Sequence, residues 1–428
     1  MLGLIVLGCF LILALIGVPI VMAIAAAGII GMYVAGFGNA MFIVPQQVLE
    51  GIDSSALVAI PFFILAGNLL NALGMTDRMF AFASAAVGHL RGGLAQVNIL
   101  SSLLFSGISG AAVADCAALG TVEIKAMRER GYSADFSASI TAASSIIGPL
   151  FPPSIPLLIY AFVARESVGR LFLAGILPAI MITLALMIYV WLIAKKKNLP
   201  ILSRAGFSEV VSHGVDGFLA IMAPVIILFS MLSGVATASE AGVITCIYTL
   251  GLGLYYRTFT WSKLHQAFRE SVHLTGLVVL MLGFSTVISW VLAISQVPQS
   301  LATFTLSSIS EPWVFLLIYV LFFLFLGMIF DTLAAMVVLL PVVLPIADIM
   351  GFDPVHFGVV TIFALMIGIL TPPLGIALYI MMDIAKQPFG VLSRAIIPFL
   401  IPLFIALIIV AFVPQISLFL PDLIMGPR

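Results

Sequence analysis

The chain has 428 residues, of which 63% are hydrophobic and only 8% are charged, with 17 Lys and Arg against 18 Asp and Glu. Soluble domains carry roughly 25% charged residues. Three stretches, 1–49, 271–310 and 395–421, contain no Asp, Glu, Lys or Arg, and each is longer than the ~20 residues that cross a bilayer. The composition therefore indicates a polytopic membrane protein and excludes a soluble enzyme, a nucleic-acid binder and a secreted disulfide scaffold.

The apolar segments predict an all-α protein of about ten transmembrane helices and two re-entrant hairpins. In chain order, the first set is helices at 2–16, 20–35 and 57–73, a hairpin at 92–122, a proline-broken helix at 136–162 and a helix at 171–194. The second set is helices at 218–233, 238–255 and 274–293, a hairpin at 313–345, a broken helix at 357–380 and a last helix at 396–414.

The two sets look like copies of one unit. The stretch that begins at Gly148 and ends in two prolines returns 220 positions later, beginning at Gly368. We therefore expect a first repeat at 1–194, a cytoplasmic polar linker at 195–216 and a second repeat at 217–428.

Basic residues predict that the repeats face opposite sides of the membrane. The loop that holds Lys125 and Arg128 corresponds to 345–350, which contains Asp348 and no basic residue. Lys and Arg stay on the cytoplasmic side of short loops, so this difference indicates an inverted-topology repeat. Such repeats are typical of secondary transporters, which hold substrate and coupling ion near the midplane.

Both hairpins are predicted to turn inside the membrane. Arg91 and Lys125 flank the first hairpin on the same side, so the apolar segment between them has to enter and return. Its turn is expected at 106–110, and the second turn at 327–331. Re-entrant backbone is tolerated only where it is buried in protein or lines a wet cavity, so the turns mark a functional site.

The paired prolines suggest what this site binds. Proline removes a backbone donor and leaves upstream carbonyl groups free, and broken helices present such carbonyls to coupling ions. A bound Na⁺ is expected where each turn meets its break, with no organic cofactor and no other metal. The first sodium site is predicted at Ser106, Ser109, Gly148, Phe151 and Pro153. The second is predicted at Gly327, Phe330, Gly368, Thr371 and Pro373.

Two carboxylates and one hydroxyl are candidates for substrate contact or gating. Asp331 lies at the second turn, Asp115 on the second arm of the first hairpin and Ser154 beside the first proline pair. An acid inside the membrane is costly and is usually functional. Asp115 could equally be a helix N-terminal charge or the partner of a lysine. No catalytic residues are predicted, since no Ser/His or paired-Asp arrangement is visible.

The sequence resembles the large membrane subunit of tripartite ATP-independent periplasmic (TRAP) transporters, the DctM-like family, over essentially its whole length. The motifs that carry the resemblance are PFFILAG at 61–67, SGISG at 106–110, Ala114-Asp115, 148–156, ATASEA at 236–241 and Thr-Pro-Pro at 371–373. Family members commonly have Thr-Glu-Ala in the fifth of these motifs, where Ser239 stands before Glu240 here.

The resemblance implies a sodium-coupled uptake system for organic acids, such as C4-dicarboxylates, sialic acid or keto acids, in a bacterial inner membrane. It implies two protein partners, a small four-helix membrane subunit (DctQ-like) and a periplasmic substrate-binding protein (DctP-like), besides membrane lipid and no nucleic acid. It also implies an elevator movement of the hairpins and broken helices against the remaining helices. Arg165 and Arg170 are candidates for docking the binding protein, or for anchoring at the headgroup level.

Two other classes stay open at this stage. A stand-alone sodium/dicarboxylate symporter has similar inverted hairpins, but such proteins resemble Ser-Asn-Thr at both turns, and this chain has Ser106-Gly107-Ile108 and Gly327-Met328-Ile329 there. A membrane-embedded enzyme would need catalytic side chains on facing helices.

Overall fold

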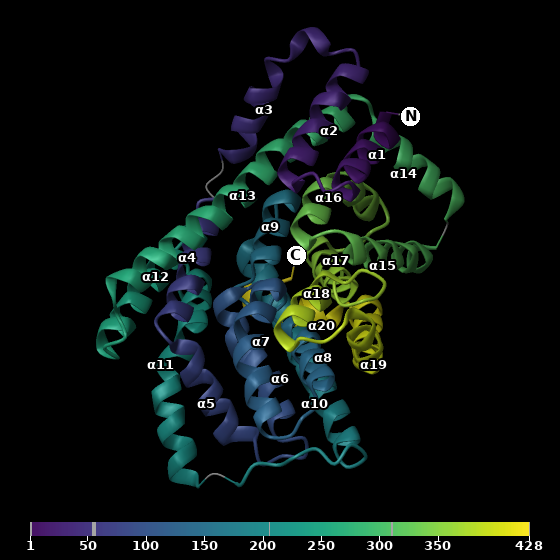
Figure 1. Ribbon diagram of the computed structural model, residues 1–428. Coiled ribbons are helices and arrows are strands. Elements are labelled where there is room, and N and C mark those ends of the chain that lie inside the picture. The colour runs from purple at the N-terminus through teal and green to yellow at the C-terminus, as the bar shows by residue number, and fades with distance from the viewer. Residues whose placement is uncertain (1, 54–56, 205, 310, 428) are drawn as a thin grey trace.

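A computed structural model describes residues 2–53, 57–204, 206–309 and 311–427, without the side chains of residues 4, 107–109, 207 and 209. Over these residues the chain forms twenty α-helices and one short 3-10 helix, and no strand (Figure 1). The prediction of an all-α fold is confirmed.

The first half of the chain contains ten of the α-helices and the 3-10 helix. They are α1 (Leu2–Leu15), α2 (Ile20–Val34), the 3-10 helix η1 (Gly38–Ala40), α3 (Ile43–Ile52), α4 (Ala59–Ala72), α5 (Met75–Val87), α6 (Leu94–Ser109), α7 (Ala112–Glu129), α8 (Ala134–Ser145), α9 (Ile155–Ala164) and α10 (Val168–Ala194). The first predicted hairpin is the pair α6 and α7, and the first broken helix is the pair α8 and α9. Helix α7 continues to Glu129, seven residues beyond the predicted end at Val122.

The second half contains the other ten. They are α11 (Phe207–Leu232), α12 (Ala238–Tyr255), α13 (Trp261–Ile294), α14 (Val297–Ser308), α15 (Pro312–Ile329), α16 (Thr332–Ile349), α17 (Pro354–Gly368), α18 (Ile376–Ala385), α19 (Phe389–Phe412) and α20 (Gln415–Met425). Both ends of α16 lie 220 positions after the ends of α7. The contacts repeat as well: α7 packs on α8 and α18, while α16 packs on α17 and α9.

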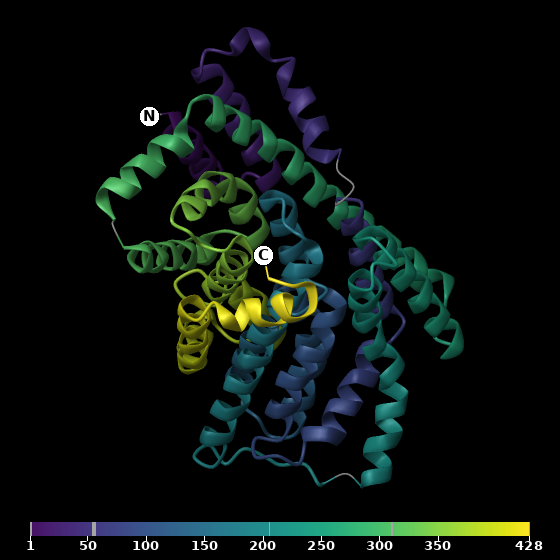
Figure 2. The same cartoon turned by 180° about the vertical axis from the view of Figure 1, so that it is seen from behind.

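The helices gather into two groups. One is a flank of α1 to α5 and α11 to α14. In it the long helix α13 packs on α2, α3 and α4, and α12 and α11 continue along α4 and α5 (Figure 1). The other is a bundle of α6 to α10 and α15 to α20, which Figure 2 shows from behind with α20 crossing it. The flank meets the bundle through α4 and α5 on α6 and through α13 and α14 on α16. Both hairpins and both broken helices belong to the bundle.

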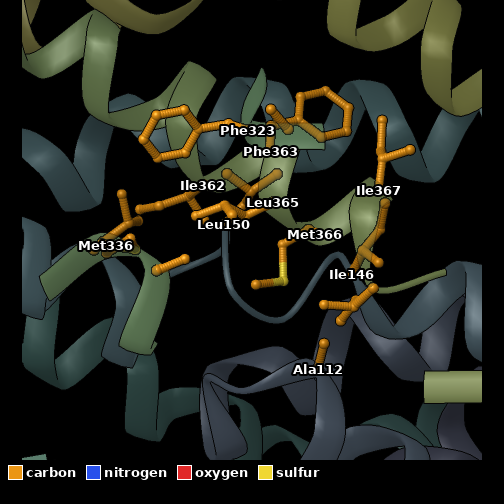
Figure 3. Close-up of a cluster of buried hydrophobic side chains, with 14 of the residues drawn as sticks. Ala112, Ile146, Leu150, Phe323, Met336, Ile362, Phe363, Leu365, Met366 and Ile367 are labelled. Atoms are coloured by element: carbon orange, nitrogen blue, oxygen red, sulfur yellow. The ribbon is translucent and has the colours of Figure 1, made fainter. Parts of the chain in front are cut away.

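One apolar core joins the two halves of the bundle. Figure 3 shows Ile146 and Leu150, from the first broken helix, in one cluster with Phe323 of α15 and Met366 of α17, and all four side chains are buried. Side-chain packing of this kind fixes the two breaks relative to each other.

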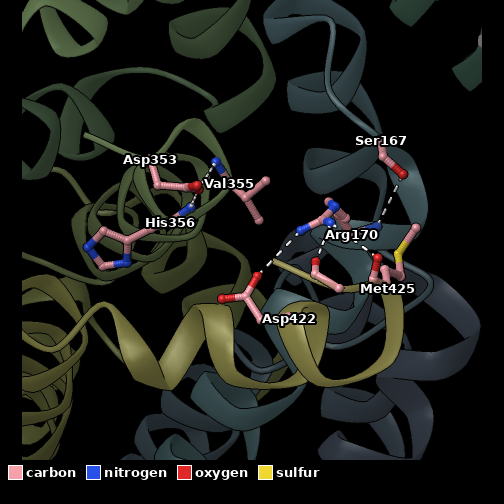
Figure 4. A network of polar contacts seen from close by, with 8 residues as sticks. Ser167, Arg170, Asp353, Val355, His356, Asp422 and Met425 are labelled. Atoms are coloured by element: carbon pink, nitrogen blue, oxygen red, sulfur yellow. Dashed lines mark hydrogen bonds and ion pairs between the residues drawn. The ribbon is translucent and has the colours of Figure 1, made fainter. Parts of the chain in front are cut away.

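Side chains cap several helices at their N-termini. The carboxylate of Asp353 accepts hydrogen bonds from the backbone N–H groups of Val355 (2.8 Å) and His356 (3.1 Å) at the start of α17 (Figure 4). Thr237 and Glu240 form a reciprocal capping box at the start of α12. The cap is therefore complete, although Ser239 stands before Glu240 where DctM-like proteins commonly have Thr.

Six helices in the described part of the chain are long and apolar enough to cross a membrane, or seven if the bent pair α4 and α5 counts as one crossing. The two arms of the second hairpin, α15 and α16, are among the six. An 18-residue helix rises about 27 Å, so length alone does not make this hairpin re-entrant. Shorter apolar helices account for further apolar segments. They include α1, α2, α9, α17 and α18.

Candidate functional site

The turn of the first hairpin packs directly on the first broken helix. The turn lies at Gly110 and Ala111, between α6 and α7, and φ of Gly110 is +59°. The backbone N–H of Ile155 donates to the Gly110 carbonyl at 3.3 Å. A Cβ atom at Gly110 would lie 2.6 Å from the carbonyl oxygen of Pro153. Only glycine adopts this backbone conformation readily and also allows this close approach. The hairpin turn and the proline break are therefore in direct backbone contact.

The break leaves several carbonyl groups without a helical partner. Residues 152, 153 and 156 are prolines and have no backbone N–H. The carbonyl groups four residues earlier therefore lack the hydrogen-bond donor that a continuous helix would supply. Gly148 is one of these. The carbonyl of Phe151 would be served by the N–H of Ile155, which donates to Gly110 instead. Residues 152–160 are buried, and the break therefore places oxygen atoms in a buried position where hard cations bind.

Ser154 closes the break and begins the next helix. Its side-chain oxygen accepts a hydrogen bond from the N–H of Leu157 at 3.1 Å and its hydroxyl donates to the Pro149 carbonyl. Ser154 is 2% exposed. The geometry gives this residue a capping role at the break, beside the predicted ion site.

Asp115 lies against the break. A Cβ atom at Gly148 would lie 2.2 Å from Asp115 Oδ2, and the Asp115 side chain is fully buried. Asp115 also stands in the first turn of α7, where a carboxylate interacts favourably with the helix dipole. The structure thus brings together a carboxylate and a predicted ion ligand that are 33 positions apart in the chain.

The other predicted ligands of the first site lie around the same break. Ser106 is fully buried, and its hydroxyl donates to the Leu103 carbonyl at 2.5 Å. The side chain of Ser109 lies outside the described residues. Pro153 is buried with its carbonyl against Gly110, and Phe151 is half-buried.

The second set of predicted ligands is less closely assembled. Gly327 of α15 and Gly368 of α17 are in direct backbone contact, since a Cβ at Gly368 would lie 2.6 Å from Gly327 Cα. The Thr371 hydroxyl, in the break after α17, donates to the carbonyl of Ile367 in the last turn of that helix at 2.7 Å. Pro373 is exposed. The glycine pair lets α15 and α17 cross closely, while Thr371 and Pro373 have other surroundings.

Phe330 and Asp331 form the second turn. The ring of Phe330 stacks on Phe10 of α1, with centroids 5.4 Å apart, and so ties the turn to the flank. Asp331 caps α16 by accepting a hydrogen bond from the N–H of Leu333 at 2.9 Å. Capping therefore accounts for the position of Asp331, and the turn contacts the flank through its aromatic ring.

The two breaks differ in burial. Residues 141–150 and 152–160 are buried without interruption around the first break, whereas Pro373 and Leu374 at the second break are exposed. In this conformation the first break is covered by its hairpin turn and the second is open on the surface of the chain.

A polar network beside the first site was not predicted from the sequence. Glu123 of α7, Asn98 of α6, and Thr141 and Ser144 of α8 are all at most 1% exposed and are linked by hydrogen bonds. The signal was the spacing of polar residues at 137, 141, 144 and 145 in an apolar helix, which places them on one helical face.

Arg170 is occupied within the chain. Its guanidinium lies 3.5 Å from Asp422 Oδ1 and donates to the Gly426 carbonyl at 2.5 Å, so it holds the C-terminal helix α20 on the bundle (Figure 4). This partner argues against Arg170 as a docking residue. Arg165 is exposed and lines a cavity of about 630 Å³ between α9, α16 and α17 that also contains Glu166 and Asp348.

A helical bundle with two proline-broken helices, each crossed by a hairpin, is the architecture of a membrane transporter. Residues 7–416 match the family described as the tripartite ATP-independent periplasmic transporter, DctM component. The chain is 46% identical over 382 residues to the sialic acid TRAP transporter large permease protein SiaM of Vibrio cholerae, covering 89% of this chain and 90% of that one. It is 38% identical to the sialic acid TRAP transporter permease protein SiaT of Haemophilus influenzae, covering 97% of this chain and 67% of that one.

The fold is shared more widely. The crystal structure of the YdaH transporter of Alcanivorax borkumensis superposes with a TM-score of 0.61 at 15% identity, over 92% of this chain and 90% of that one. The chain belongs to the DctM family of TRAP transporters. It is the large permease subunit of such a system, a multi-pass protein of a bacterial inner membrane and a transporter component rather than an enzyme. The family resemblance seen in the sequence is confirmed.

Proposed function

We propose that this subunit takes up an organic acid together with Na⁺, and that sialic acid is the first substrate to test. The choice of substrate rests on the names of the relatives SiaM and SiaT, both sialic acid permeases. C4-dicarboxylates and other carboxylates are the next candidates, since the family resemblance covers several organic acids.

The observation that carries the proposal is the first turn packed on the first break. Carbonyl groups that have lost their helical donors, with Asp115 Oδ2 against Gly148, offer oxygen ligands and one negative charge in a buried place. Na⁺ is a hard cation that such oxygens coordinate. The residues present therefore suit a sodium ion held by Gly148, Phe151 and Pro153, with Asp115 balancing its charge.

The second sodium ion is proposed at the equivalent position of the second repeat. Gly327 and Gly368 supply closely spaced backbone there, and the exposed Pro373 leaves the break accessible. Binding at this site would draw Thr371 and the second turn together. Substrate binding beside this open break, gated by Asp331, is part of the same proposal.

Transport is proposed to occur by an elevator movement of the bundle along the flank. Both breaks and both hairpins lie in the bundle, and the bundle meets the flank through few helices, chiefly α4, α5, α13 and α14. The flank also has a small apolar cluster of its own, formed by Ala66 and Leu69 of α4, Cys246 of α12 and Ala267 of α13. A movement of one group along the other would carry the sites across the membrane without unfolding either.

The proposed partners are a small four-helix membrane subunit and a periplasmic substrate-binding protein. The flank exposes large apolar side chains over much of its surface, for example Phe218 and Phe229 of α11 at 54% and 72%. Such a surface suits lipid or a helical partner. Arg165 is the remaining candidate for pairing with an acid on the binding protein.

The test is uptake of labelled sialic acid by liposomes that contain this chain and the small subunit, with the binding protein outside. We expect uptake only with an inward Na⁺ gradient and with both partners present. Equal uptake in K⁺ or choline would refute sodium coupling. Na⁺-driven uptake of free substrate by this chain alone would favour a stand-alone symporter.

A further inference from the structure

Glu123 is a fully buried carboxylic acid that the proposed transport site does not use. It lies on α7, two turns beyond Asp115, and is 0% exposed. The amide nitrogen of Asn98 on α6, also 0% exposed, donates to Glu123 Oε2 at 2.5 Å and to Thr141 Oγ1 on α8 at 2.7 Å. The acid is therefore held between the two arms of the first hairpin and the first broken helix.

Neighbouring hydroxyl groups determine which way the Asn98 amide points. The Thr141 hydroxyl donates its single proton to the Ser137 carbonyl at 2.9 Å, so its oxygen is left to accept from Asn98. Asn98 Oδ1 accepts from the Ser144 hydroxyl at 2.9 Å. The amide NH₂ group thus faces Glu123, and Oε2 of Glu123 is a hydrogen-bond acceptor.

The other oxygen of Glu123 has no partner. Oε1 is buried and makes no hydrogen bond with any described group. The ion pairs found among the described residues, Arg170 with Asp422 and Lys386 with Asp383, do not involve Glu123. A buried carboxylate with neither a cation nor a second donor is strongly unfavourable, and such a group is neutralised.

The surroundings of Glu123 contain few other titratable groups. Helix α6 has none, and α8 contributes only Asp135, half-buried in its first turn. Helix α18 carries Asp383, which is exposed and paired with Lys386 at 3.8 Å. On α7 itself, Cys116 donates to Ser145, and Asp115 adds negative charge. The charge of Asp115 disfavours an ionised Glu123. The basic residues of α7, Lys125 and Arg128, are exposed and form no ion pair with Glu123 within the described part of the chain.

A metal cation would fit poorly at this point, because Asn98 presents hydrogen atoms to both Glu123 and Thr141. A proton needs only the free oxygen. We propose that Glu123 is a proton-binding site, with the proton on Oε1 and Asn98 bonded to Oε2, and that this proton is bound while the first hairpin is closed against α8.

This site would make closure of the hairpin sensitive to pH. Glu123, Asn98 and Thr141 lie on three different helices, so separating these helices would admit water and let the acid ionise. One linked proton changes the closure equilibrium by at most about tenfold per pH unit. Raising the pH on the side to which the hairpin opens should favour opening.

Infrared spectroscopy of the purified transporter tests the protonation without any transport assay, so its result is separate from that of the uptake experiment. Labelling wild-type protein with ¹³C-carboxyl glutamate should shift a carboxylic-acid C=O band. That band should vanish in Glu123→Gln and remain in Glu129→Gln, an exposed control on the same helix. Absence of a shifted acid band in the wild type, or loss of carboxylate bands alone in Glu123→Gln, would overturn the proposal. The labelled wild type gives an answer even if Glu123→Gln does not fold.

The pH dependence of transport tests the link to the hairpin. Gln is neutral and keeps an oxygen for Asn98, so Glu123→Gln should transport with a pH profile flattened relative to the wild type, while Glu129→Gln keeps the wild-type profile. Identical profiles for the wild type and Glu123→Gln would overturn the link between protonation and closure.

Discussion

The contact between Gly110 and Pro153 can be tested by adding one methyl group. In Gly110→Ala the new Cβ would lie 2.6 Å from the carbonyl oxygen of Pro153, on a residue with φ of +59°. The obstacle is backbone rather than a flexible side chain, so either the turn or the break has to move. We expect the substitution to open the first site while leaving the rest of the bundle in place.

Two terms contribute to the magnitude. A left-handed backbone conformation costs a residue other than glycine about 1–2 kcal/mol. Overpacking against a well-packed neighbour costs about 1–3 kcal/mol more. Gly131, in the loop between α7 and α8, isolates the first term, because its φ is +87° and a Cβ there meets nothing within 4 Å. Gly110→Ala should therefore lower the population of the closed turn about 5- to 150-fold more than Gly131→Ala does.

The assay is Na⁺-driven uptake in liposomes as a function of Na⁺ concentration, together with thermal unfolding of both variants. Gly110→Ala should raise the Na⁺ concentration needed for half-maximal uptake or abolish uptake, and Gly131→Ala should lower stability slightly with near-normal Na⁺ dependence. Equal Na⁺ dependence in the two variants would refute the assignment of the turn to an ion site.

Three further predictions concern the ligands, the second turn and the topology. Gly148→Val should reduce uptake more than Ser109→Ala, because a side chain at Gly148 collides with Asp115 Oδ2. Main-chain ligands, in contrast, survive the loss of a hydroxyl group. The reverse order in the uptake assay would contradict main-chain coordination. Asp331→Ala should remove most uptake, and Asp331→Asn, which keeps the cap worth about 1 kcal/mol, should separate charge from capping: full uptake by the Asn variant would leave only the structural role. Single cysteines at Ala126 and Asp348, in a background without the native cysteines, should react with an impermeant reagent from opposite sides, and labelling from one side would exclude an inverted repeat.

The sequence was sufficient for the architecture because apolar length and proline are strong local signals. A stretch of apolar residues too long for a soluble helix predicts a membrane span, and paired prolines predict a broken helix because they lack N–H donors. Both broken helices and both hairpin turns follow from such signals. Helices α11 and α13 begin 11 and 13 residues before the expected starts at 218 and 274, and α5, α14 and α20 were not predicted. The end of α7 was placed too early because Lys125 marks the cytoplasmic flank of the hairpin in the sequence, whereas the helix continues past it to Glu129.

Long-range packing accounts for what the sequence left open. Arg170 pairs with Asp422 and Gly426, which lie 252 and 256 positions away at the C-terminal end. The second set of predicted ligands is less closely assembled than the repeat suggests: Phe330 packs on Phe10, and Pro373 is exposed.

The sequence by itself determined the class of protein, the helical repeat and the positions of the two breaks, because each depends on residues close together in the chain. Only the tertiary structure decided which carbonyls and carboxylates meet. The contact of Asp115 with Gly148 and the enclosure of Glu123 by Asn98 join separate helices. The energy of a buried polar group depends on every neighbour that desolvates it or hydrogen-bonds to it, and helical periodicity does not specify those neighbours.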